Sequence, residues 1–230
     1  MLKPIAATLL ALIAVGAAGT ASRADTILIG GPASSDLAFP FGAGATTADP
    51  ATRYQQAYNA ALFAPAFPGE AFRIDSITFF STQGGTFNPA TYQVSFSTTS
   101  AAVSALNGTN LDANVGPGQT LFATATPSGA VGSTFTIAGT APFLYDPTRG
   151  NLLMDIRVVG QSMAPITATF DGHFGDFGTD SNSVSNYGLN TPGTGLVTQF
   201  NVTAVPEPAS LWLLGLGAAS LGVAVRRRRA

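Results

Sequence analysis

The 230-residue sequence contains no cysteine, one tryptophan and one histidine, and only 10% of its residues are charged. Without cysteine there is no disulfide, thiolate nucleophile or cysteine-ligated zinc site. An average soluble protein is about 25% charged. Against this shortage, 46% of the residues are hydrophobic, and glycine (26) and proline (15) are plentiful. This profile is typical of an all-β extracellular protein or of a chain with membrane-directed ends.

The few charges are unevenly distributed. Lys3 and Arg23 lie near the N-terminus, and four consecutive arginines lie at the C-terminus. Between them, residues 25–204 contain four arginines against eleven acidic residues, a net charge of −7. Because phosphate backbones are bound by basic surfaces, this acidic body excludes nucleic acid as a partner.

Residues 1–24 have the pattern of a secretory signal peptide. Lys3 supplies the positive n-region, residues 5–18 are apolar, and Ser22 and Ala24 are the small residues of a cleavage site. The apolar segment is shorter than the roughly 20 residues needed to span a bilayer, which disfavours an uncleaved anchor. The sequence therefore predicts export by the secretion machinery and cleavage by signal peptidase after Ala24.

A second apolar segment lies near the C-terminus, at residues 209–225. As a helix it would be about 25 Å long, at the short end of the transmembrane range. Trp212 lies near its outer boundary, where an indole favours the headgroup layer. The four arginines that follow predict a stop-transfer signal on the cytoplasmic side. They are Arg226, Arg227, Arg228 and Arg229.

Pro206, Glu207 and Pro208 precede this apolar segment. Each proline fixes its own φ near −65°, lacks a backbone donor and restricts the residue before it to extended geometry. The result is a stiff, extended stretch that suits the substrate groove of a protease.

In these three parts the tail, residues 205–230, resembles the PEP-CTERM sorting signal of Gram-negative bacteria. The resemblance implies that a membrane-embedded exosortase recognises Pro206, Glu207 and Pro208 and removes the helix and arginines. The body would then pass to the cell surface or extracellular matrix. The alternative is an ordinary C-terminal anchor, which needs no Pro-x-Pro border. The tail is also similar to a segment labelled as an ice-binding protein C-terminal domain, but the body lacks the regular threonine repeats of an ice-matching face.

Residues 25–204 show period-two alternation with glycine and proline turns, which predicts an all-β, antiparallel, jelly-roll-like β-sandwich. A phase slip at Asp75 and Ser76 predicts a β-bulge. Asp155 and Arg157 lie two residues apart on the other face of their strand, a spacing that allows them to pair. Residues 54–63 fit a strand and turn or a single helical turn. The predicted strands are 72–80, 91–99, 133–138, 151–159 and 196–204, with weaker candidates at 120–126 and 164–170.

One segment concentrates residue types that carry chemistry. Asp171, Asp176 and Asp180 lie within ten residues of one another, with His173 and several glycines among them. Carboxylates of this kind can hold Ca²⁺, although the spacing is not that of an EF-hand, and the alternative is a solvated surface loop. A Ser-His-Asp site at His173 is a further alternative.

A glycosidase-like carboxylate pair is another alternative, and its candidates are Glu70, Asp75 and Asp155. No nucleophile elbow, phosphate loop or zinc-ligand pattern is present.

The sequence thus predicts a non-enzymatic exported protein with a structural or adhesive body, handled by an exosortase and with exopolysaccharide as a further partner. It would be anchored transiently in the inner membrane, arginines cytoplasmic, before delivery. The alternatives are a carbohydrate-binding module with a Ca²⁺-assisted loop at 171–180 and a hydrolase on a sandwich scaffold. No cofactor is predicted other than that Ca²⁺.

Overall fold

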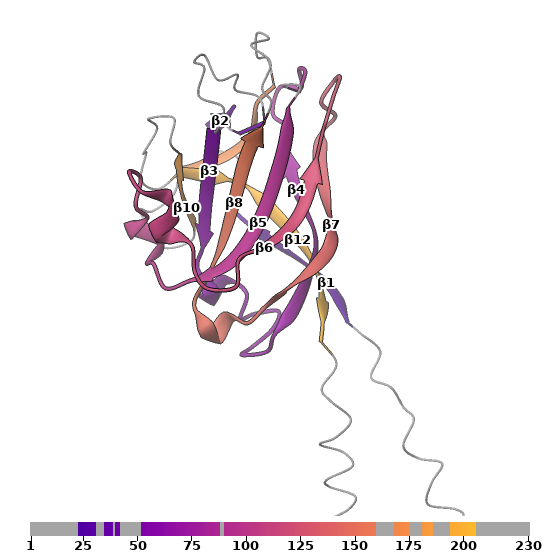
Figure 1. Cartoon of the computed structure of the whole chain (residues 1–230). Helices are drawn as coiled ribbons and strands as arrows, with labels where there is room; N and C mark the ends of the chain where they lie inside the picture. Colours follow the sequence, from indigo (N-terminus) through magenta and orange to yellow (C-terminus); the bar gives the residue numbers. More distant parts are fainter. Residues whose placement is uncertain are drawn as a thin grey trace, which may run out of the picture. The chain divides into compact units, whose positions relative to one another are not determined.

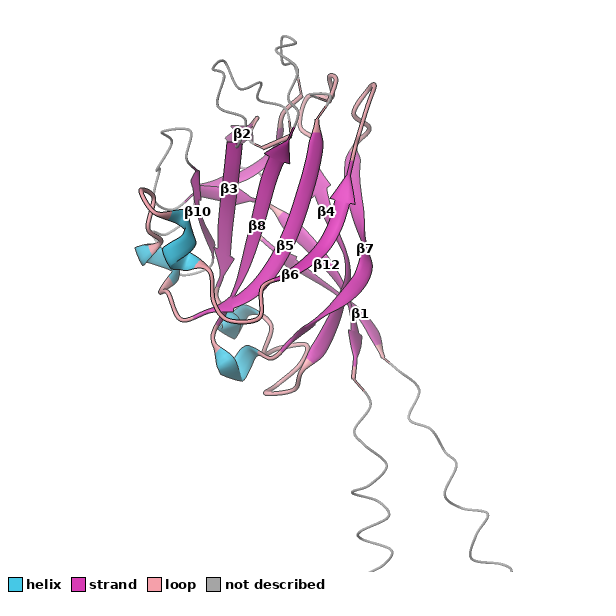
Figure 2. Ribbon diagram, in the orientation of Figure 1, coloured by secondary structure: helices cyan, strands magenta, loops and turns pink. Residues whose placement is uncertain are grey.

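The computed structural model describes residues 23–30, 35–38, 40–41, 52–87, 90–159, 168–174, 181–185 and 194–205, which form strands joined by loops and short 3₁₀ turns (Figures 1 and 2). The strands are β1 Ala24–Ile29, β2 Ser35–Leu37, β3 Thr52–Tyr58, β4 Phe72–Phe80, β5 Thr91–Thr99, β6 Thr120–Ala125, β7 Thr134–Tyr145, β8 Asn151–Val159, β9 Phe170–Phe174, β10 Ser181–Ser185, β11 Thr194–Leu196 and β12 Thr198–Ala204. The 3₁₀ turns are η1 Ala60–Leu62, η2 Val103–Ala105, η3 Leu111–Asn114 and η4 Pro147–Arg149. Ala24–Ala204 form one compact unit.

The strands form two large antiparallel sheets and one small sheet. The back sheet has the order β1-β12-β4-β7, the front sheet β10-β3-β8-β5-β6, and the small sheet β11-β9-β2. One hydrophobic cluster contains inward residues of both large sheets, so the two sheets form a sandwich (Figure 1). The predicted all-β class and antiparallel sandwich arrangement are confirmed.

Alternation along the central strands builds this core. In β5, Tyr92, Val94 and Phe96 are fully buried, as the pattern predicted. In β8 the same holds for the predicted inward residues, and their neighbour Leu153 is buried as well, on the opposite face. Phenylalanine and tyrosine rings fill the space between the sheets, and Phe200 of β12 contacts Tyr58 of β3 edge-on, with ring centroids 5.0 Å apart.

The bulge predicted at Asp75 and Ser76 is confirmed, because the register of β4 shifts between Ile74 and Ser76. Ile74 pairs with Phe143 while Ser76 pairs with Ala138, so the intervening residues of β7 leave the regular ladder. This irregular stretch accommodates Pro142, which has no amide hydrogen to donate. The strand therefore runs well beyond the predicted end at residue 138.

Two local predictions can be compared with the structure, and one strand was not predicted. Residues 54–63 form the rest of β3 and then η1, which Asn59 caps by accepting a hydrogen bond from the Ala61 amide. The 120–126 candidate is confirmed as β6. β1 was not predicted at all, because the short segment 24–29 directly follows the predicted signal peptide and only Ile27 and Ile29 are buried in it.

Candidate functional site

The two ends of the compact unit lie side by side. β1 begins at Ala24 and β12 ends at Ala204, and these antiparallel strands pair Ala24 with Thr203 (Figure 1). On its other side β12 pairs with β4, where Ala204 lies opposite Phe72. Val205, the next residue, is 39% exposed. The folded body therefore ends one residue before Pro206.

The start of β12 is fixed by buried polar contacts. The hydroxyl groups of Tyr58 and Thr198 are 2.8 Å apart, and the Gln56 amide donates to the Leu196 carbonyl at 3.0 Å. The Leu196 amide in turn donates to Gln56 Oε1 at 2.9 Å. Gln56 thus donates to and accepts from the backbone of Leu196, so both polar atoms of this buried side chain are hydrogen-bonded.

The remainder of β12 is held from β4. Asn201 Nδ2 donates to Ser76 Oγ at 2.8 Å, and the Thr203 hydroxyl donates to the Asp75 carboxylate. Asp75 is the bulged residue of β4, and the bulge directs its carboxylate towards Thr203 near the end of β12. Asp75 is thereby engaged in a structural contact rather than in a carboxylate pair.

Most residues of the predicted sorting tail lie outside the described residues. These are Pro206, Glu207, Pro208, the apolar segment 209–225, and Arg226, Arg227, Arg228 and Arg229. Within the described part of the chain, no helix reaches the length and apolarity that crossing a bilayer requires. The predicted cleavage residue Ala24 is described and is the first residue of β1.

The compact all-β unit thus ends directly before the Pro-Glu-Pro segment in the sequence. Comparison with family models identifies the tail: residues 204–229 match the PEP-CTERM protein-sorting motif. The resemblance drawn from the sequence is confirmed, and the motif implies exosortase-dependent sorting of an exported protein. The match begins at Ala204, the last residue of β12. No curated protein and no solved structure matches the chain.

The acidic segment is only partly described. Asp171 lies in β9 directly opposite Asp36 of β2, and Gln83 donates to the Asp36 carboxylate. Burial raises the pKa of Asp171, and the negative charge of Asp36 raises it further. Asp176 and Asp180 lie outside the described residues. Among the residues that are described, no group of three or more acidic, histidine or cysteine side chains is arranged to hold a metal.

The residues that the two enzymatic alternatives named lie on several elements of the fold. His173 lies in β9 opposite Gly195, and Glu70 lies in the turn before β4. Asp155 is 1% exposed in the middle of β8, where it accepts two hydrogen bonds from Arg53, at 2.8 and 2.5 Å, and one from Gln119 at 2.8 Å. Asp155 pairs with Arg53 rather than with Arg157, because the guanidinium of Arg53 on the neighbouring strand presents a fork that matches both carboxylate oxygens.

This charge cluster extends beyond the sheet. Arg53 Nη1 also donates to Asp112 of η3 at 2.6 Å, and Arg157 Nη2 lies 3.9 Å from the same carboxylate. Hydrogen bonding to Asp155 raises the pKa of Arg53 more than burial lowers it. Sequence reasoning missed this network, although an aspartate in a largely apolar strand is a signal that a partner must exist.

Proposed function

We propose that this chain is a surface or matrix protein with a signal peptide at 1–24, a folded body at 25–204 and a temporary anchor at 205–230. Signal peptidase cleaves after Ala24. The helix 209–225 holds the exported body at the inner membrane with Arg226–Arg229 in the cytoplasm. An exosortase then recognises Pro206, Glu207 and Pro208 and transfers the body to the cell surface or matrix.

The observation that carries this proposal is the position of the sorting motif at the end of β12. The motif match begins at the last strand residue, and Val205 is the single residue between the strand and Pro206. An extended chain rises about 3.3 Å per residue, so this single residue adds only about that length between the strand and Pro206. The processing enzyme therefore meets the motif immediately beside a folded domain.

We assign the body a jelly-roll topology. Counting β1, β3, β4, β5, β6, β7, β8 and β12 as strands one to eight, the back sheet reads 1-8-3-6 and the front sheet, apart from β10, reads 2-7-4-5. This alternation between two antiparallel sheets supports the assignment. The charged residues Asp155 and Arg53 of the body form an ion pair with each other, which favours a structural or adhesive role for the body. Exopolysaccharide is the partner that we propose for it.

The test replaces Pro206, Glu207 and Pro208 with alanine in the full-length gene product. The expected result is that the protein keeps its uncleaved size after signal-peptide removal and stays in the membrane fraction. The matched control is alanine substitution of residues 126–128, an exposed proline-containing turn between β6 and β7. Normal trimming and surface delivery of the Pro-Glu-Pro variant would overturn the proposal.

A further inference from the structure

A surface groove of about 600 Å³ lies at the edge of the sandwich, where β6 of the front sheet faces β7 of the back sheet. Its lining includes Thr98, Ser100 and Thr120, which carry hydroxyl groups, Pro142 and Leu144 of β7, and Arg149. The volume lies within the range of small-ligand sites, roughly 300–1,000 Å³.

The irregular part of β7 creates this groove. Between Ala138 and Phe143 the strand leaves the β4 ladder and approaches β6, where the Thr140 hydroxyl donates to the Phe122 carbonyl at 3.0 Å. Gly139 lies against the Phe122 ring so closely that a Cβ atom there would stand 2.4 Å from the ring. The crossing therefore depends on glycine, and the strand residues after it form one wall of the groove.

The turn that carries Arg149 is rigidly built. Asp146 caps η4 by accepting hydrogen bonds from the Thr148 amide at 3.0 Å and from its hydroxyl at 2.6 Å. The Tyr145 hydroxyl donates to the Gly150 carbonyl at 2.8 Å. Gly150 has φ 135° and packs against the Thr99 carbonyl, leaving no room for a side chain. The backbone of Arg149 is thus fixed before any ligand arrives.

The charge of the groove is unlike that of the body. Its lining combines the Arg149 guanidinium with hydroxyl groups and contains no carboxylate. Within the described part of the chain no carboxylate lies within 4.0 Å of Arg149, whereas Arg53 and Arg157 both lie near Asp112. Arg73, the cross-strand partner of Leu144, brings a second exposed guanidinium beside this wall. An acidic body thus carries a local site suited to an anion.

We propose that this groove binds a carboxylate-bearing sugar unit of an acidic polysaccharide. Arg149 pairs with the carboxylate through two parallel hydrogen bonds. The hydroxyls of Thr98, Ser100 and Thr120 bond to sugar hydroxyls, and Pro142 and Leu144 pack against the C–H face of the ring. Binding of the sugar is argued from the groove alone. The role of this binding in attaching the protein to a matrix rests on the proposed delivery to the surface.

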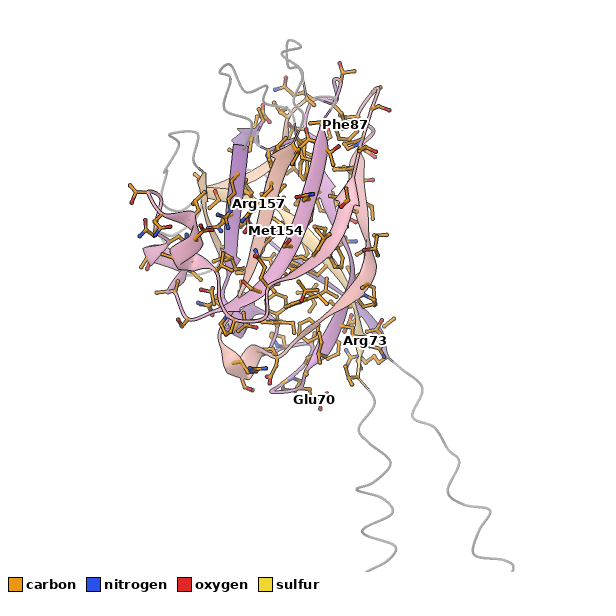
Figure 3. All side chains as sticks on the ribbon, in the orientation of Figure 1. Glu70, Arg73, Phe87, Met154 and Arg157 are labelled. Carbon is orange, nitrogen blue, oxygen red and sulfur yellow. The ribbon has the colours of Figure 1, made fainter. Side chains whose placement is uncertain are left out.

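The test is calorimetric titration of the full-length chain in detergent with a galacturonate tetramer. Replacing the guanidinium in Arg149→Gln is expected to weaken binding about ten-fold or more, because a charge-assisted pair is lost. Leu144→Asp, which places a carboxylate in the wall, is expected to weaken binding as well. The matched control is Arg157→Gln, which removes the same charge from an exposed position on the front sheet (Figure 3) and should leave binding unchanged.

Several results would overturn the proposal. They are absence of binding to the uronate, equal binding of a neutral maltotetraose, equal losses in Arg149→Gln and Arg157→Gln, and tighter binding of a tetrapeptide with a free C-terminal carboxylate. The sorting assay and the uronate titration, both done on the parent protein, separate the two proposals. If the parent protein is trimmed normally but does not bind the uronate, only the proposal of uronate binding is overturned. If the parent protein binds the uronate but is not trimmed, only the sorting proposal is overturned.

Discussion

The outer faces of the two large sheets differ although both follow the same alternation. On the front sheet, Gln55, Leu153 and Asp155 point away from the main core and are nevertheless buried. On the back sheet, two rows across all four strands contain hydroxyl, amide and apolar side chains but no charge. These rows are Thr26–Asn201–Ser76–Ala138 and Leu28–Gln199–Thr78–Thr136.

The β5–β6 connection explains this difference. It folds back over the front sheet, where Val103 forms a second small core with Ala57 and Leu153. Gln55 donates to the Leu111 carbonyl at 3.0 Å and accepts from Asn114 at 2.9 Å. Asn107 organises the connection by accepting hydrogen bonds from the amides of Thr109 and Asn110. A loop can therefore turn a solvent face into an interior.

The largest expected effect comes from breaking the charge pair under this loop. Asp155→Ala leaves the guanidinium of Arg53 largely buried without its two-oxygen partner, which should reduce the free energy of unfolding by about 3–5 kcal/mol. Urea unfolding followed by circular dichroism measures it. Asp155→Asn keeps the shape and one acceptor and should lose less. A loss below about 1 kcal/mol in Asp155→Ala would show that the front face is not a true interior.

The second effect concerns the small core. Leu153→Ala should cost about 2–4 kcal/mol and increase hydrogen exchange in residues 101–118, because the loop loses its main apolar contact on β8. Its counterpart is Leu28→Ala on the outer back face, where Leu28 is 56% exposed and a loss below about 1 kcal/mol is expected. Similar losses in both variants would erase the contrast between the two faces.

A smaller effect is expected on the back face itself. The hydroxyl groups of Thr78 and Thr136 are 2.8 Å apart, and Thr78→Val removes that hydrogen bond while keeping the side-chain shape. Because water reaches the exposed Thr136 hydroxyl, the loss in unfolding free energy should stay below about 1 kcal/mol. Ile77→Ala, one residue away on the inner face, should cost about 2–5 kcal/mol. Thermal unfolding compares the two.

The smallest effect is a pH dependence at the edge of the loop. The hydrogen bond and charge of Arg53 lower the pKa of Asp112. A lowered pKa in the folded state contributes stability above the unfolded pKa, and this contribution is lost as the pH falls through the folded value. NMR titration of Asp112 should show its pKa rise towards the ordinary value in Arg53→Gln. An unchanged pKa in that variant would contradict the pairing.

Sequence reasoning predicted what depends on local pattern. The inward faces of β5 and β8 and the bulge at Asp75 follow from alternation, and the sorting motif follows from three parts in fixed order. The Arg53–Asp155 pair could not be predicted, because 102 residues separate its partners and only the strand order brings β3 beside β8. The groove at Arg149 has the same limitation, since it requires the crossing of β7 to β6.

The place of β12 has a consequence for the order of folding. In the described structure β1 pairs only with β12, and contacts such as Thr26 to Asn201 span 175 residues of sequence. Contacts this distant form late and slowly. During synthesis and export from the N-terminus, β1 has no partner strand and one edge of β4 stays unpaired until β12 has emerged up to residue 204. The back sheet can therefore be completed only after the whole body has been exported, when the sorting motif is the next segment of the chain to follow.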